Sequence, residues 1–193
     1  MQREETSNKQ NSFVVFLPTP VVSLNFVHIR ILERMQPTER MDDTMTVQEN
    51  IALARSQLDL YNSHRTDPAW LDKIVAALAE DCEIIDVPTG RTLRGPDGIR
   101  QLNLFFAEGF PDSSVELTNV FATEDQAVVE FTGRGTNTGP LHMPTGDIPP
   151  TGQYSELRFC SVNRAKSGKI VSIHSYYDVM TMLQQLGLVP AMG

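Results

Sequence analysis

The chain has 193 residues, of which 40% are apolar and 21% charged, as in a soluble globular protein with one ordinary domain. Its formal net charge of −8 argues against a nucleic-acid partner, because neutralising phosphates requires a surplus of Lys and Arg on one face. The two Cys and four His residues show no metal-ligand spacing, so we expect no metal site, no disulfide and a reducing, cytoplasmic location.

The N-terminal stretch differs from the rest of the chain. Apolar runs between residues 13 and 27 are interrupted by prolines, so they are too broken for a transmembrane helix and lack the features of a signal peptide. The periodic pattern begins only after Met45. We therefore predict that residues 1–45 are a poorly ordered extension and that residues 46–193 form the folded domain. An upstream start in gene calling is our hypothesis for the origin of the extension.

Three helices are predicted in the first half of the domain. A capping box of Thr46 and Glu49 begins a helix that runs to about Tyr61. Proline at the first helical position predicts a second helix over residues 67–78 and a third over residues 95–106.

Strands dominate the second half, where the apolar pattern changes to period two. A hairpin of strands 82–87 and 92–93 is also predicted between the second and third helices. The remaining predicted strands are residues 114–122, 126–136, 154–165 and 169–177. A helix over residues 178–186 closes the domain, and the Gly- and Pro-rich segment 138–152 is the one long loop. This order predicts an α+β fold, a cone-shaped curved antiparallel sheet with helices packed on its concave face.

Asp86 is the carboxylate with the most unusual setting. It ends an apolar strand just before a Pro-Gly turn, and it shares a strand face with Ile84. On an apolar face a carboxylate loses hydration, which suits it to proton transfer. The alternative is that Asp86 accepts hydrogen bonds from the backbone of the turn at residues 87–90.

Several spaced blocks in the second half of the domain carry a family resemblance. They are Gly133–Leu141, Ile148–Gly152, Gly168–Ile170, Tyr176–Asp178 and Leu183–Leu188. With the order of elements, these blocks resemble the SnoaL-like ester cyclases of the nuclear-transport-factor-2-like superfamily, over residues 47–190. The resemblance implies a small oligomeric enzyme of the cone fold that works without a cofactor, as in the intramolecular aldol closure of polyketide rings.

The resemblance also implies where catalytic groups should lie. Polyketide cyclases carry an acid/base Asp at the position of Ser175 and a His at the position of Ser161, and a hydroxyl cannot replace either as a base without a partner. Asp86 and its turn resemble the general base of the ketosteroid isomerases. The oxyanion Tyr of those isomerases corresponds to Ser56.

Strand parity predicts which side chains face the interior of the cone. If Ser175 faces inward, Val171, Ile173 and Tyr177 share its face, and Leu157, Phe159, Ser161 and Asn163 face inward from the neighbouring strand. We expect Asp86 and Tyr177 to be catalytic and Ser175, Ser161, Asn137, Phe159 and Ile173 to bind substrate. Alternatively, the inward residues simply fill the cone as core.

Two further polar residues have open alternatives. The amide of Asn137, at the rim, either orients a substrate carbonyl or stabilises a turn. Glu130, in mid-strand, either supplies a second acid or points outward. The outer face of the sheet, with Cys160, Val162, His174 and Tyr176, predicts a homodimer or higher homo-oligomer.

Two functions remain open at this point. The first is a cofactor-independent acid–base enzyme, a cyclase-like lyase or isomerase that forms an enolate from a small apolar carbonyl compound. Asp86 would be its base, with Tyr177 or Ser175 as hydrogen-bond donor. The second is a non-catalytic small-molecule-binding or scaffold protein, which the two serine replacements favour. An open cavity beside a buried Asp86 supports the enzyme, whereas a cavity filled by Phe159 and Ile173 supports the scaffold.

Overall fold

The structure is a computed structural model that describes residues 44–143 and 146–190. The chain divides into two units, Met1–Arg40 and Met41–Gly193, and all described residues lie in the second. Most of the predicted extension lies outside the described residues. Met45, which that prediction assigned to the extension, is buried.

Four α-helices lie in the described part of the chain, and they are α2 (Val47–Asn62), α3 (Trp70–Ala76), α4 (Gly95–Gly109) and α5 (Val179–Gln185). The predicted capping box is confirmed, because the Thr46 side chain accepts from the Glu49 N–H and the Glu49 carboxylate accepts from the Thr46 N–H. The second helix is shorter than predicted. Leu78, the last residue of the predicted helix, instead begins a strand, where its side chain is buried.

Eight strands are described. They are β1 (Leu78–Asp86), β2 (Arg91–Arg94), β3 (Ser114–Ala122), β4 (Gln126–Thr136), β5 (Leu141–Met143), β6 (Gly146–Ile148), β7 (Tyr154–Lys166) and β8 (Lys169–Tyr177). The segment predicted as one long loop thus contains a short hairpin, because β5 pairs with β6. The frequent Gly and Pro of this segment hid the hairpin from the periodicity argument.

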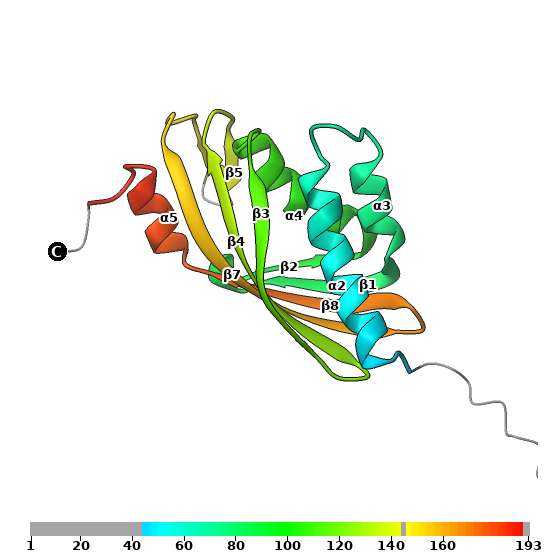
Figure 1. Cartoon of the computed structure of the whole chain (residues 1–193). Helices are drawn as coiled ribbons and strands as arrows, with labels where there is room; N and C mark the ends of the chain where they lie inside the picture. The colour runs from blue at the N-terminus through cyan, green and yellow to red at the C-terminus, as the bar shows by residue number, and fades with distance from the viewer. Residues whose placement is uncertain (1–43, 144–145, 191–193) are drawn as a thin grey trace, which may run out of the picture. The chain divides into compact units, whose positions relative to one another are not determined.

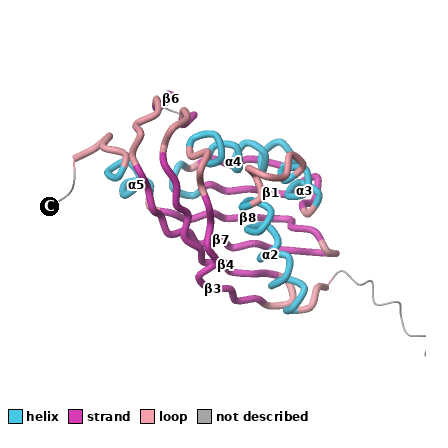
Figure 2. The backbone as a smooth tube through the Cα atoms, turned by 45° about the horizontal axis from the view of Figure 1, so that its top comes forward, coloured by secondary structure: helices cyan, strands magenta, loops and turns pink. Residues whose placement is uncertain are grey.

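Six of the strands form one curved sheet in the order β2-β1-β8-β7-β4-β3. All neighbours are antiparallel except β1 and β8, which run parallel. Helices α2, α3 and α4 lie on one side of this sheet (Figure 1). In the second view the strands lie side by side beneath them (Figure 2). The predicted α+β class and curved, mainly antiparallel sheet are confirmed.

The core lies between this sheet and the helices. Ile84 and Cys82 of β1 are fully buried, and Trp70 and Ile74 of α3 pack with them and with Ile170 of β8. Each such apolar side chain contributes about 1.5–3 kcal/mol by leaving water. No helix within residues 44–143 and 146–190 is long and apolar enough to cross a membrane.

One parity prediction is wrong. The pairing of β7 with β8 shifts between Arg164 and Ala165, which is the mark of a β-bulge. The extra residue moves Val171 out of the inward row, and Ile170 faces inward in its place. Beyond the bulge the predicted parity holds, so Ile173, Ser175 and Tyr177 share the concave face.

Candidate functional site

A cavity of about 170 Å³ lies between the concave face of the sheet and helices α2 and α4. Its walls are mainly apolar. The helices contribute Leu58, Ile99, Leu102 and Phe106, and the sheet contributes Phe131, Leu157, Phe159 and Ile173. Phe159 and Ile173 line the cavity and leave it open, as the enzyme alternative requires.

Aromatic rings form one wall of the cavity. Phe159 of β7 stacks on Phe131 with ring centroids 5.0 Å apart, and lies 5.1 Å from Tyr177. Phe106 of α4 meets Phe159 and Tyr177 edge-on, at centroid distances of 5.5 and 5.7 Å. Gly133 gives this cluster room, because a Cβ there would lie 3.0 Å from the Phe159 ring. The wall is suited to a flat, apolar ligand.

A polar row crosses the sheet next to the aromatic wall. Asp86 of β1 pairs with Ser175 of β8, which pairs with Ser161 of β7. Direct partners in neighbouring strands share a face, so all three side chains lie on the concave side. The two serine oxygens are 3.4 Å apart, and both serines line the cavity. The structure therefore brings these three predicted site residues together on one face of the sheet.

The carboxyl group of Asp86 is 3% exposed and only partly bonded. Thr89, in the short 3-10 helix η1 (Val87–Thr89), donates its hydroxyl to Oδ2 at 2.5 Å. Oδ1 is buried and has no hydrogen-bond partner among the described residues. The one bond from the turn therefore comes from the Thr89 hydroxyl and not from the backbone N–H groups that the turn alternative named. Asp86 itself is not among the residues that line the cavity.

Tyr177 connects Asp86 to the cavity, because it lines the cavity and interacts with the carboxylate. Burial raises the pKa of the Tyr177 phenol well above its ordinary value of 10.0, and the neighbouring Asp86 carboxylate adds to the shift. The charge of Arg91 opposes it. Tyr177 is therefore a neutral hydrogen-bonding group at physiological pH.

Asn137 lies apart from this set. It is fully buried, its amide donates to the carbonyls of Gly109 and Gly139 at 3.0 and 2.9 Å, and its oxygen accepts from the N–H and hydroxyl of Thr151. All four hydrogen bonds of the amide are used within the fold, which favours the turn-stabilising alternative. Glu130 is exposed and lies outside the cavity lining.

Sequence reasoning did not identify Tyr61 and Gln57 as polar groups of the cavity. Tyr61 lines it and shares a 2.8 Å hydrogen bond with Ser113, whereas Ser56, the position compared with the isomerase Tyr, bonds the carbonyl of Leu53. Gln57 also lines the cavity, as does Asn163, which strand parity predicted to face inward. Gln57 could have been found from its position one turn after Ala54 on the buried face of α2.

The cavity lining is almost free of charge. Arg134 is its one charged side chain among the described residues, and Glu116 and Glu156 bind its guanidinium at 2.7 and 2.8 Å. No cluster of His, Cys, Asp or Glu in the described part of the chain could hold a metal ion. The site therefore presents neutral donors and acceptors with one buried carboxylate behind them.

The sequence pattern of the family described as SnoaL-like polyketide cyclase matches residues 52–186. The chain belongs to this family. No curated protein sequence gives a significant match.

Several solved structures share the fold. A protein of Jannaschia sp. CCS1, described as a SnoaL-like polyketide cyclase, is 19% identical with a TM-score of 0.65, over 75% of this chain and 95% of its own. AclR of Streptomyces galilaeus, described as a hydroxylase, is 21% identical with a TM-score of 0.63, over 77% and 91%. An LEH-like epoxide hydrolase of M. tuberculosis is 18% identical with a TM-score of 0.53, over 72% and 90%. Such different descriptions on one fold mean that activity depends on the site residues.

Proposed function

We propose that this SnoaL-like protein is a cofactor-independent enzyme that moves a proton on a small neutral carbonyl compound, with Asp86 as the base. One observation carries the proposal. The buried Asp86 carboxylate, with an oxygen that has no partner among the described residues, interacts with Tyr177, which lines the cavity. An unpaired buried polar atom costs about 1–3 kcal/mol, more when it is charged, so a purely structural Asp86 would be expected to have both oxygens bonded.

Tyr177 gives the base a route to the ligand. The Tyr177 oxygen accepts a proton from the carbon next to the substrate carbonyl, while the phenolic proton passes to Asp86. The substrate is left as an enolate, and the reverse transfers return a proton to it at the same or another carbon. The raised pKa of Tyr177 suits this relay, because the phenol stays protonated until the substrate proton arrives. The hydroxyls of Ser161 and Ser175 can donate to the enolate oxygen.

Proton exchange tests the proposal without knowledge of the natural substrate. The protein is incubated in D₂O with single-ring ketones, and deuterium uptake next to the carbonyl is followed by NMR. Asp86→Asn should lower the exchange rate by about 10²–10⁴-fold. Asp81→Asn, an exposed Asp on the same strand, is the matched control and should exchange like the parent. Absence of catalysed exchange in the parent, or equal exchange in the Asp86→Asn variant, contradicts the proposal.

The second candidate is a binding protein that performs no chemistry. It is favoured because Ser161 and Ser175 replace the acid/base pair implied for cyclases, and because Asp86 does not itself line the cavity. Tight binding of a ring compound with no catalysed exchange would support it.

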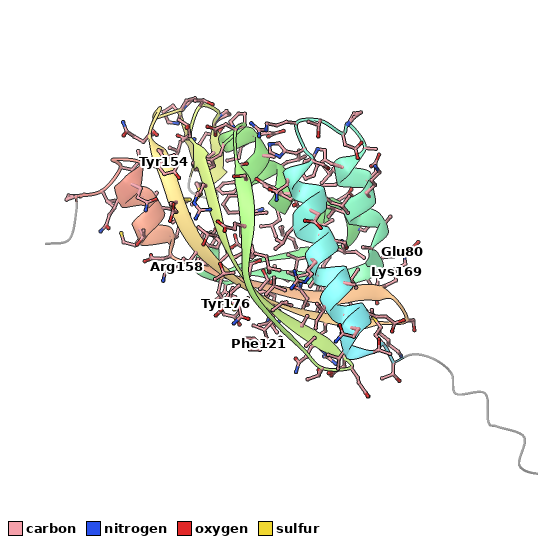
Figure 3. The ribbon with its side chains drawn as sticks, viewed as in Figure 1. Glu80, Phe121, Tyr154, Arg158, Lys169 and Tyr176 are labelled. Carbon is pink, nitrogen blue, oxygen red and sulfur yellow. The ribbon has the colours of Figure 1, made fainter. Side chains whose placement is uncertain are left out.

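We also propose that the protein forms a homodimer or larger homo-oligomer through the outer face of the sheet. Phe121 and Tyr176 are 60% and 42% exposed, and with Arg158 they project from the side of the sheet opposite the helices (Figure 3). Exposed aromatic side chains gathered on one face are typical of an interface between proteins.

A further inference from the structure

Two unpaired amide groups lie in the cavity. Gln57 Nε2, a donor, and Asn163 Oδ1, an acceptor, are both buried and have no hydrogen-bond partner among the described residues. The described part of the chain has two other such side-chain atoms, Asp86 Oδ1 and Gln184 Nε2. Most buried polar atoms in proteins are bonded, so two unpaired amides in one cavity require an explanation.

The sheet register places the two amides in the same region of the cavity. Asn163 pairs with Ala127 of β4, and Ala54 of α2 packs against Ala127 and Val129. Gln57 follows Ala54 by three residues, so both lie on the same side of α2. We call Gln57 and Asn163 the amide end of the cavity.

The cavity changes from polar to aromatic along one strand. Inward-facing residues of β7 run in the order Asn163, Ser161, Phe159 and Leu157. A ligand that lies along β7 therefore has neutral hydrogen-bonding groups at one end and the aromatic wall at the other. The single charged group of the lining, Arg134, is already held by two carboxylates. Burial of an ionic ligand would leave its charge without a partner.

The volume limits the size of this ligand. An apolar cavity of about 150 Å³ holds one benzene molecule. The 170 Å³ cavity therefore encloses one substituted six-membered ring rather than a fused multi-ring body.

We propose that Gln57 and Asn163 select a neutral single-ring ligand that carries a hydrogen-bond acceptor and a donor at one end, with the ring against Phe159. The Gln57 N–H donates to the ligand oxygen, and the Asn163 oxygen accepts from the ligand N–H or O–H. The inference rests on the proposed function in taking this cavity as the ligand site, and deepens it by naming the ligand class. Benzamide has both groups, whereas toluene has the ring alone.

Binding of these two probes tests the selection. Dissociation constants for benzamide and toluene are measured by ligand-observed NMR with the parent, Gln57→Met, Asn163→Leu and, as matched control, Gln101→Met, which removes an exposed amide from α4. Each cavity variant should lower the preference for benzamide over toluene by about twofold to twelvefold, which is the value of one neutral hydrogen bond. The Gln101→Met control should retain the preference of the parent.

A second readout separates binding amides from structural ones. Removing an unpaired buried amide should leave the melting temperature of the ligand-free protein unchanged or higher, whereas removing a structural amide, or one bridged only by water, should lower it. The inference is overturned if the parent binds neither probe, if the preference is unchanged in both cavity variants, or if both variants melt early. Loss of catalysed proton exchange with an intact benzamide preference would remove the proposed function and leave this inference standing.

Discussion

Two buried amide sites in this domain have opposite hydrogen bonding. At the Asn137 corner, formed by Asn137, Gly109, Gly139 and Thr151, the side-chain amide makes four hydrogen bonds and faces no cavity. At the amide end, one buried donor and one buried acceptor, on residues that line the cavity, have no partner among the described residues. The paired amide of Asn137 therefore stabilises the fold. The unpaired amides of Gln57 and Asn163 cost stability, and these are the groups that we propose for binding a ligand.

Replacing the paired amide gives the largest expected effect. Asn137→Leu leaves the carbonyls of Gly109 and Gly139 and the N–H of Thr151 without their partner, so the free energy of unfolding should fall by about 2–4 kcal/mol. Urea denaturation measures it. Asn163→Leu, the same change at the unpaired site, is the control and should cost little. Equal losses in the two variants would remove the distinction between the two sites.

The buried phenol of Tyr61, which is paired with Ser113, gives a pH-dependent test of the same comparison. Tyr61 is buried, which raises the pKa of its phenol from 10.0 to about 12, and the hydrogen bond that it shares with Ser113 opposes the shift. Because the folded pKa lies above the unfolded one, the neutral phenol stabilises the fold fully below pH 10. This contribution is lost as the pH rises to 12, by about 1.4 kcal/mol per pH unit.

Tyr61→Phe should therefore flatten the loss of stability between pH 10 and 12, as measured by denaturation at a series of pH values. Part of the slope should remain, since burial and Asp86 also raise the pKa of Tyr177. If the free energy of unfolding falls with pH as steeply in the Tyr61→Phe variant as in the parent, the Tyr61 phenol of the parent is accessible to solvent.

The outer face of the sheet extends the comparison to aromatic side chains that the structure leaves exposed. Tyr176→Ser should weaken self-association about tenfold, because a buried aromatic contributes strongly to an interface. Light scattering across micromolar concentrations measures the mass. Met180→Ser, which truncates an exposed apolar side chain of α5, is a matched control. A monomer mass for the parent throughout this range would refute the predicted oligomer.

Removing the N-terminal stretch is expected to have the smallest effect. The capping box gives α2 its own start, and a chain that begins at Met45 keeps that buried side chain. Its melting temperature should stay within a few degrees of the parent. Insolubility of the shortened chain would show that the N-terminal stretch is structural.

Strand parity and turn chemistry predicted much of the fold and part of the site. Alternation along β7 and β8 correctly placed Ser161, Ser175 and Tyr177 on one face, because side chains alternate wherever the pairing is regular. It failed at Val171, where a bulge adds one residue to the pairing. A bulge of this kind depends on the partner strand, so the local sequence alone does not reveal it.

The hydrogen bonding of buried amides could not be predicted in the same way. Asn137 and Asn163 are the same residue type in neighbouring strand-rich segments. The bonding of Asn137 depends on Gly109 and Thr151, which are distant in sequence, and the isolation of Asn163 depends on which helix residues lie above it. These are properties of tertiary packing, so strand parity placed the serines and Asn163 on the inward face but could not show which amides have hydrogen-bond partners.

The central claim is that Asp86 and Tyr177 act as one proton path, and a double-mutant cycle tests it most directly. Ketone exchange rates are compared for the parent, Asp86→Asn, Tyr177→Phe and the double variant. If the two residues form one relay, each single change removes most of the catalysis, and the double variant is no slower than the slower single one. Independent effects that multiply in the double variant, or a Tyr177→Phe variant as fast as the parent, would contradict the claim.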